Sequence, residues 1–316
     1  MQAERDAGTG TREPRRSLVP LGLLVGIMAI STSPVLVRLA HLPALSLAFW
    51  RCLAGALLLA PFAWWPRRRR PSLERREVGR LLAAGAFLAV HFALFNASLS
   101  FTTVASAAVL VSASPLFVGL GAALIGEPPS RRAWLGIGLA TAGAVVIGLG
   151  DVADVDLGPR ALLGDAMAFA GAATFAGYLL LGRSIRQRLP VAAYATSVYG
   201  TAALLLLPAC LVTGAALGGY PARSWLVVAA VIAGPQLLGH TVFNGLLATV
   251  TATVVAVVTL AEPLGASLLA WVVFAEVPSV WLFAGAPLVL AGVWLVIITP
   301  RAGSAGRLPA WPARRA

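Results

Sequence analysis

The sequence predicts an all-α membrane protein that crosses the bilayer many times. Of its 316 residues, 59% are hydrophobic and only 11% are charged, and the mean hydropathy is +0.86. A water-soluble domain spends about a quarter of its residues on Asp, Glu, Lys and Arg. The charged residues of this chain are crowded into short segments between long apolar runs, which excludes a soluble globular protein.

Ten apolar runs are long enough to cross a bilayer core about 30 Å thick, which requires about 20 helical residues. Polar residues, proline and glycine separate these runs. The first run is too long for a secretory signal and lacks a small-residue cleavage site, so we expect it to remain a membrane helix. The predicted spans are 18–39, 43–65, 78–99, 103–124, 131–150, 161–182, 191–213, 223–246, 249–274 and 278–298.

The arginines predict the orientation of these spans. All 24 basic residues are arginine, and all but four lie in the two tails or in the loops on one side of the predicted membrane. The exceptions are Arg38, Arg160 and Arg223 on the opposite side and Arg51 within a span. Because basic residues concentrate in cytoplasmic loops, both termini are predicted to be cytoplasmic. The same rule favours a cytoplasmic loop over a nucleic-acid site for the arginine run at 67–70.

An internal repeat divides the chain into two copies of five spans. An odd number of spans turns the second copy over in the membrane, so we predict two inverted repeats, an arrangement common in secondary transporters. The expected boundaries are a cytoplasmic tail at 1–17, repeats at 18–150 and 161–298, an outer loop at 151–160 and a second cytoplasmic tail at 299–316. The matching residues are Pro43 and Pro61 with Pro190 and Pro208 at an offset of 147, Phe95-Asn96 and Pro115 with Phe243-Asn244 and Pro263 at 148, and Glu127, Gly136 and Gly143 with Glu276, Gly285 and Gly292 at 149.

Several short segments carry a family resemblance. The first copy contains Ala105-Ser-Ala-Ala-Val-Leu-Val-Ser-Ala-Ser-Pro115, Gly126-Glu127-Pro128, Gly136 and Ala142-Gly143. The second contains Gly239-His-Thr-Val-Phe-Asn244, Ala252-Thr-Val-Val-Ala, Glu262-Pro263, Ala275-Glu276 and Ala291-Gly292. In order, spacing and duplication the chain resembles the EamA-type permeases of the drug/metabolite transporter superfamily over residues 18–298. The resemblance implies ten helices with cytoplasmic termini, a central cavity, and export of small metabolites or toxic compounds. One departure is Ala275, which stands where the first copy has Gly126.

Few ionisable residues lie at membrane depth, where each costs about 2.5–3.5 kcal/mol on insertion scales. Arg51, His91 and Glu262 are expected near the midplane, the depth at which secondary transporters place substrate and coupling sites. Glu262 is the leading candidate, because a carboxyl group there can bind an amine or exchange a proton. The alternative is a structural glutamate that braces a kink at Pro263.

The other buried polar residues have competing interpretations. His91 and His240 can couple protonation to transport, although a histidine on an apolar helix is more often a packing residue. Arg51 is an anion contact, a counter-ion for Glu262 or, as we favour, a structural residue. Tyr178 and Trp50 are deep enough to line a cavity.

A second group of residues is assigned to structure. Pro115 and Pro263 are predicted to kink their spans and to provide hinges. Asn96 and Asn244 precede very short connections, so we expect them to cap helix ends. Glu127 and Glu276 each precede a new helix, whose positive amino end favours a carboxylate.

Together these features predict a secondary transporter of the inner membrane that exports a small amino-acid-like metabolite or a drug by alternating access, with protons as candidate coupling ions. The alternatives are a channel and a membrane-embedded enzyme or scaffold. A channel requires a longer polar stripe along its helices. Nothing in the sequence matches the common hydrolase, metal-helix or nucleotide-binding motifs, so we expect neither enzymatic activity nor a cofactor, metal or nucleic-acid partner.

Overall fold

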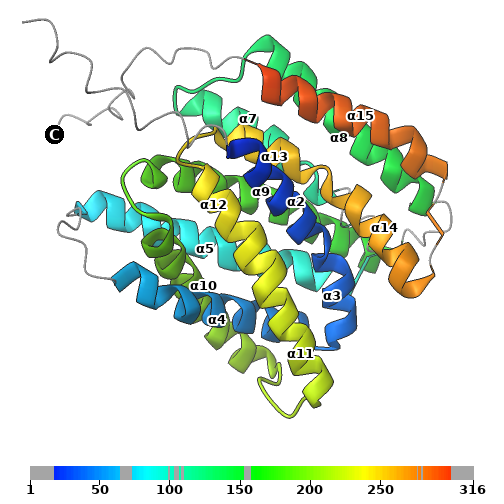
Figure 1. Ribbon diagram of the computed structural model, residues 1–316. Helices are drawn as coiled ribbons and strands as arrows, with labels where there is room; N and C mark the ends of the chain where they lie inside the picture. Colours follow the sequence, from blue (N-terminus) through cyan, green and yellow to red (C-terminus); the bar gives the residue numbers. More distant parts are fainter. Residues whose placement is uncertain are drawn as a thin grey trace, which may run out of the picture.

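The computed structural model describes residues 18–64, 73–98, 100–102, 107, 110–152, 158–275, 277–278 and 280–299, and every regular element in these ranges is a helix (Figure 1). The elements are α2 (Val19–Ser31), α3 (Ser33–Ala40), α4 (Ala44–Trp64), α5 (Arg75–Ser98), α7 (Ser114–Leu124), α8 (Arg131–Val152), α9 (Pro159–Arg186), α10 (Val191–Thr213), α11 (Ala222–Val231), the π-helix η1 (Ile232–Thr241), α12 (Val242–Leu246), α13 (Ala252–Thr259), α14 (Glu262–Phe274) and α15 (Val280–Ile298).

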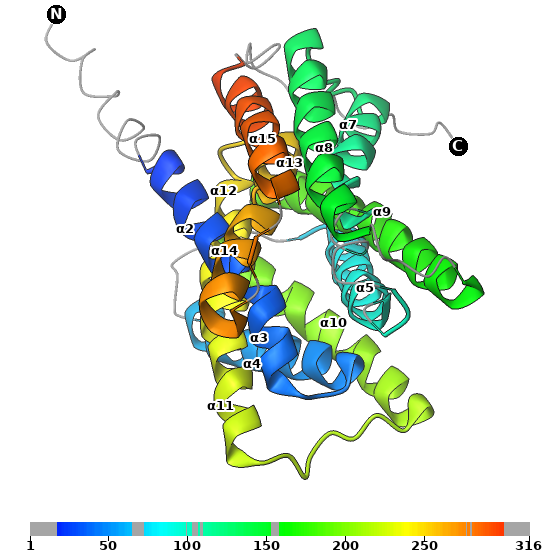
Figure 2. The ribbon, with the colours of Figure 1, turned by 90° about the vertical axis from the view of Figure 1, so that its right-hand side faces the viewer.

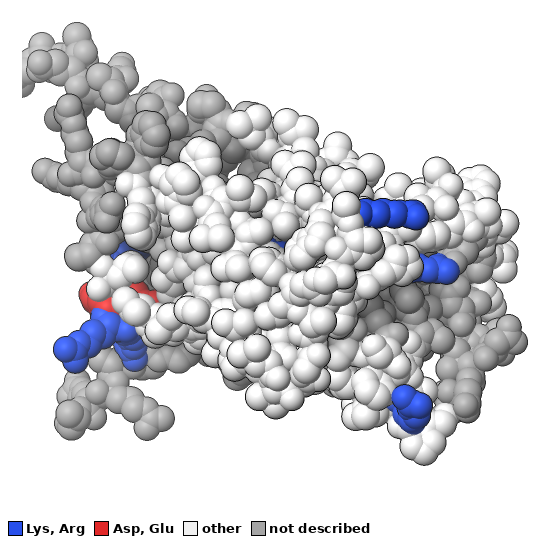
Figure 3. All heavy atoms as spheres, turned by 90° about the horizontal axis from the view of Figure 1, so that it is seen from below, with Lys and Arg blue, Asp and Glu red and all other residues white. Residues whose placement is uncertain are grey.

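Eight helical segments within the described ranges are long and apolar enough to cross a membrane. They coincide with eight of the predicted spans, and the positions of the other two hold α8 and the short apolar helix α7. Large apolar side chains such as Leu124, Val212 and Val272 point outward, as expected of residues that face lipid. On the face drawn in Figure 3, charged side chains gather at two opposite ends and the surface between them is almost entirely uncharged.

Proline accompanies the interruptions of the first, eighth and ninth spans. The first divides at Thr32, just before Pro34, because proline offers no N–H to the preceding turn and its ring displaces the carbonyl four residues back. The eighth passes through η1, which contains Pro235. The ninth divides into α13 and α14, with Pro263 in the first turn of α14. Pro115 likewise occupies the first turn of α7. A backbone N–H in that turn has no partner within the helix, so proline loses no hydrogen bond there.

Matching helices of the two copies pack as partners. α4 lies along α10, and α8 lies along α15, as Figures 1 and 2 both show. Glycines that belong to the repeat pattern allow α8 and α15 to approach closely. A Cβ atom on Gly143 would lie 2.7 Å from the Gly285 carbonyl oxygen, and a Cβ atom on Gly285 would lie 2.4 Å from the Gly143 carbonyl oxygen. Two further pairings also join the copies: α5 packs on α9, and their counterparts η1 and α12 pack on α2.

The one departure between the copies, Ala275 in place of Gly126, lies in the turns that end α14 and α7. Gly126 and Ala275 both adopt a left-handed backbone, with φ angles of 85° and 58°. Glycine accepts this conformation without cost, whereas the Cβ atom of an L-residue is crowded. The second copy therefore keeps the same turn with a less suitable residue.

Candidate functional site

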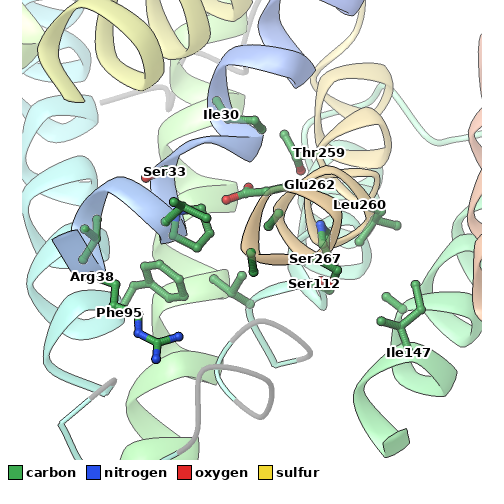
Figure 4. Close-up of a pocket in the computed structure, with 18 of the residues that line it drawn as sticks. Ile30, Ser33, Arg38, Phe95, Ser112, Ile147, Thr259, Leu260, Glu262 and Ser267 are labelled. Atoms are coloured by element: carbon green, nitrogen blue, oxygen red, sulfur yellow. The ribbon is translucent and has the colours of Figure 1, made fainter. Parts of the chain in front are cut away.

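A cavity of about 650 Å³ opens between helices from both copies of the repeat. Its walls come from the α2–α3 segment, α4, α5, the start of α7, α8 and α9, together with η1, α12, α13, α14 and the start of α15. Figure 4 shows Glu262 on α14 directed toward the α2–α3 segment, where Ile30 and Ser33 lie, while Ile147 lines the cavity from α8.

The cavity brings together the four ionisable residues that the sequence singled out at membrane depth. Arg51, His91, His240 and Glu262 come from four different helical segments and all line it. Arg38 lines it near the junction of α14 and α15, and the Arg38 guanidinium lies 4.3 Å from the centre of the Phe274 ring. The shared cavity is the main result that the tertiary structure adds to the sequence pattern.

Arg51 is held in place by two neighbours. Its side chain is only 3% exposed, and its Nε donates a hydrogen bond of 2.8 Å to Gln236 Oε1. The guanidinium lies 4.2 Å from the centre of the Phe92 ring, a cation–π contact. Its Nη2 is buried and has no hydrogen-bond partner among the residues that the structure describes.

Glu262 is the first residue of α14 and is partly buried in the cavity wall. A carboxylate in the first turn of a helix is favoured by the unpaired backbone N–H groups and the helix dipole. Arg51 is near enough to interact with Glu262 electrostatically, yet no ion pair within 4.0 Å joins them in the described part of the chain. Glu262 therefore faces the cavity with its carboxylate available.

The two histidines belong to an aromatic wall. His91 Nδ1 lies 2.9 Å from the Gly171 carbonyl oxygen, so Nδ1 donates and Nε2 is left as the acceptor of the neutral ring. The His91 ring stacks at 6.0 Å on Phe95 and lies 4.8 Å from the Phe175 ring. His240 meets the edge of the Phe92 ring at 5.4 Å. Both histidines thus pack against rings while lining the cavity.

A buried polar layer contains Tyr178 and Asn244, which do not line the cavity. The Tyr178 hydroxyl donates to Asn244 Oδ1 at 2.5 Å, and Asn244 Nδ2 donates to the Tyr199 hydroxyl at 3.2 Å. Asn96 Nδ2 donates to the carbonyl of Ala44 at 3.2 Å. Both asparagines therefore connect different helices, which differs from the capping role that the sequence predicts.

The carboxyl end of α12 is capped by residues that the sequence interpretation assigned only to a loop. Arg186 Nε donates to the Asn244 carbonyl and Arg183 Nη1 to the Leu247 carbonyl, both at 2.7 Å. Cations suit the negative carboxyl end of a helix. The two arginines are three residues apart in the last turn of α9, and this spacing places them on one face. The three-residue spacing of these arginines was therefore the feature of the sequence that could have predicted the cap.

The remaining candidates are less central. Trp50 Nε1 donates to the Leu217 carbonyl at 3.0 Å, and its ring meets Trp225, so it packs outside the cavity wall. Glu127 lies between α7 and α8, where Ser130 Oγ accepts from Ala133 N at the start of α8. Glu276 and the arginine run at 67–70 lie outside the described residues. Among the described residues, no group of His, Cys, Asp and Glu is arranged to hold a metal ion.

Comparison with known proteins agrees with this architecture. The model of the EamA-like transporter family matches residues 18–149 and 162–298. The uncharacterized transporter YwfM of Bacillus subtilis is 26% identical over 304 residues, covering 90% of this chain and 95% of that protein. An uncharacterized transporter of Archaeoglobus fulgidus is 25% identical over 281 residues, covering 87% and 95%. One solved crystal structure has a TM-score of 0.72 at 22% identity, covering 87% of this chain and 94% of the other, which supports the fold alone.

Proposed function

Because this chain belongs to the EamA-like transporter family, we propose that this multi-pass membrane protein exports a small amino-acid-like metabolite or a drug across the cell membrane by alternating access. In this proposal it has ten membrane-spanning helices in two inverted repeats, with both termini in the cytoplasm. The observation that carries the proposal is the shared cavity, to which helices of both copies contribute and in which four ionisable residues meet.

The proposed orientation gives the cavity a direction. The end marked by Arg38 and Phe274 would then face outward, and the arginine cap on α12 would lie toward the cytoplasm. In this arrangement the structure corresponds to an outward-facing state. Return to an inward-facing state requires the contacts around α12 to open and those around α3 and α14 to close, as expected when inverted repeats exchange conformations.

Glu262 is the proposed binding or coupling carboxylate. It stands at the amino end of α14 in the cavity wall, without a hydrogen bond or ion pair to a described residue. A carboxylate in that position can take the amine of a substrate or a proton. In the first role the charge of Glu262 is balanced by the bound amine, and in the second it is removed by the proton.

Purified protein in proteoliposomes tests this proposal. A panel of amino-acid analogues and cationic drugs should include compounds whose efflux depends on the protein, measured with and without a proton gradient. Glu262→Gln should abolish that efflux or remove its dependence on the gradient. The matched control is Glu77→Gln, because Glu77 pairs with Arg188 at the surface and lies outside the cavity. Unchanged transport by Glu262→Gln would remove this role from Glu262, and conversion of a compound by detergent-solubilised protein would indicate an enzyme.

A further inference from the structure

We infer that Arg51 anchors a carboxylate group of the transported compound, so that the cavity selects molecules with a carboxylate head and an apolar body. This inference rests on the proposed function, because it takes the cavity as the substrate site. It adds a specific recognition group to that site.

The guanidinium of Arg51 has donor capacity that the described residues leave unused. Arginine carries five N–H donors in a planar fork, and Gln236 Oε1 accepts from Nε. Nη2 is buried without a hydrogen-bond partner among the described residues, although Arg51 lines the cavity. A buried charged donor left unsatisfied is costly, and a carboxylate is a group that a guanidinium fork binds with two parallel hydrogen bonds.

The charges around Arg51 favour an anion from outside the protein. The contact through Nε is with a neutral amide, and the face contact is with the Phe92 ring. Glu262 interacts with Arg51 electrostatically but does not form an ion pair with it in the described part of the chain. The described residues therefore position the positive charge at the cavity without cancelling it by direct contact.

The walls beside Arg51 suit an apolar body. Phe92, Phe95 and Phe175 line one part of the cavity with aromatic rings, and Leu260, Ala266 and Ala270 contribute aliphatic surface from the α13–α14 segment. Small-molecule sites commonly combine such apolar walls with a few polar groups that fix orientation, and 650 Å³ falls in their usual size range. A carboxylate at Arg51 would place the rest of the molecule against these walls.

Three probes of similar shape separate the contribution of the carboxylate: 3-phenylpropionate, phenethylamine and 3-phenylpropanol. Calorimetry on the purified full-length protein in detergent should detect binding of 3-phenylpropionate at least about tenfold tighter than binding of the alcohol or the amine, as expected for a charged hydrogen bond. Arg51→Gln should abolish this preference, and Arg51→Lys should weaken it severalfold, because a single ammonium replaces the planar fork. Arg160→Gln is the matched control, since Arg160 also stacks on a ring, that of Phe101, but lies outside the cavity.

Gln236→Glu provides a second variant in case Arg51→Gln fails to fold. It keeps the acceptor for Arg51 Nε and adds a carboxylate that neutralises the guanidinium, so the preference for 3-phenylpropionate should disappear. Equal binding of the three probes by the wild-type protein, or an undiminished preference in the folded Arg51 and Gln236 variants, would overturn the inference. The proposed function fails by a separate result, namely the absence of transport of every compound in the proteoliposome panel.

Discussion

Two matched helix interfaces of this protein pair the same residue types at different separations. Gly26 of α2 faces Phe243 of α12, and Gly171 of α9 faces the backbone of Phe95 on α5. Phe95 and Phe243 match in the internal repeat. A Cβ atom on Gly26 would lie 2.4 Å from the Phe243 ring, whereas a Cβ atom on Gly171 would have no neighbour nearer than 3.6 Å. The matching residues Phe95 and Phe243 thus meet a glycine of the neighbouring helix at two different separations.

The helices that form these interfaces also differ in continuity. α5 and α9 run unbroken, with no proline beyond the first residue of α9. Their counterparts are interrupted before Pro34 and around Pro235. Irregular backbone at membrane depth is tolerated where it is buried in protein or lines a cavity, and the α2–α3 segment and η1 both contribute to the cavity wall. In the proposed transport cycle, this interrupted pair is where we expect movement to concentrate.

The arginine cap is a second difference between the copies. Arg183 and Arg186 bind the carbonyls at the end of α12, whereas the residues that match them at the offset of 147 are Leu36 and Leu39. Leucine offers no hydrogen bond to a helix end. At these two matched positions, only the second copy has side chains that can donate charged hydrogen bonds to a helix end.

Transferring the proline from the interrupted helix to the unbroken one should have the largest effect. Leu181 of α9 matches Pro34 at the offset of 147. Leu181→Pro should cost about 3 kcal/mol or more, because it removes a helical hydrogen bond and crowds the preceding turn. The yield of monodisperse protein in size-exclusion chromatography should fall sharply, while Leu181→Ala and Pro34→Ala should still give folded protein. A normal yield of Leu181→Pro would show that α9 tolerates interruption as α2 and α3 do.

The two glycines should respond unequally to the same substitution. Gly26→Ala should destabilise the protein by about 1–3 kcal/mol, because the new methyl group overlaps the buried Phe243 ring. Gly171→Ala should change stability by no more than about 0.5 kcal/mol, since its methyl group meets only ordinary contacts. Thermal unfolding in detergent measures both. Equal losses in the two variants would mean that the interfaces do not differ in separation.

The smallest effect is expected at the two left-handed turns. Ala275→Gly should stabilise the protein by about 1 kcal/mol, and Gly126→Ala should destabilise it by a similar amount, because only the alanine is crowded at these φ angles. The same unfolding assay, with Ala266→Gly in the interior of α14 as a control expected to destabilise, checks the sign. A loss of stability in Ala275→Gly would contradict the equivalence of the turns.

The sequence predicted the class of protein and the position of its spans because both depend on local properties. The length of an apolar run sets whether it can cross a membrane, and eight predicted spans reappear as helices of sufficient length within the described residues. Pro115 and Pro263, which the sequence singled out, stand in the first turns of α7 and α14, whereas the interruption before Pro34 was not predicted. The interruption around Pro235 took the form of a π-helix, which the sequence pattern did not predict.

The sequence by itself also selected Arg51, His91, His240 and Glu262, because an ionisable side chain in an apolar run is conspicuous whatever the packing. Only the tertiary structure decided that these four share one cavity, that Asn244 joins Tyr178 to Tyr199, and that Arg183 and Arg186 cap α12. The physical reason is that these contacts join residues tens to hundreds of positions apart. They depend on how each helix is rotated and which partner it packs against, and neither is encoded in the periodicity of a single span.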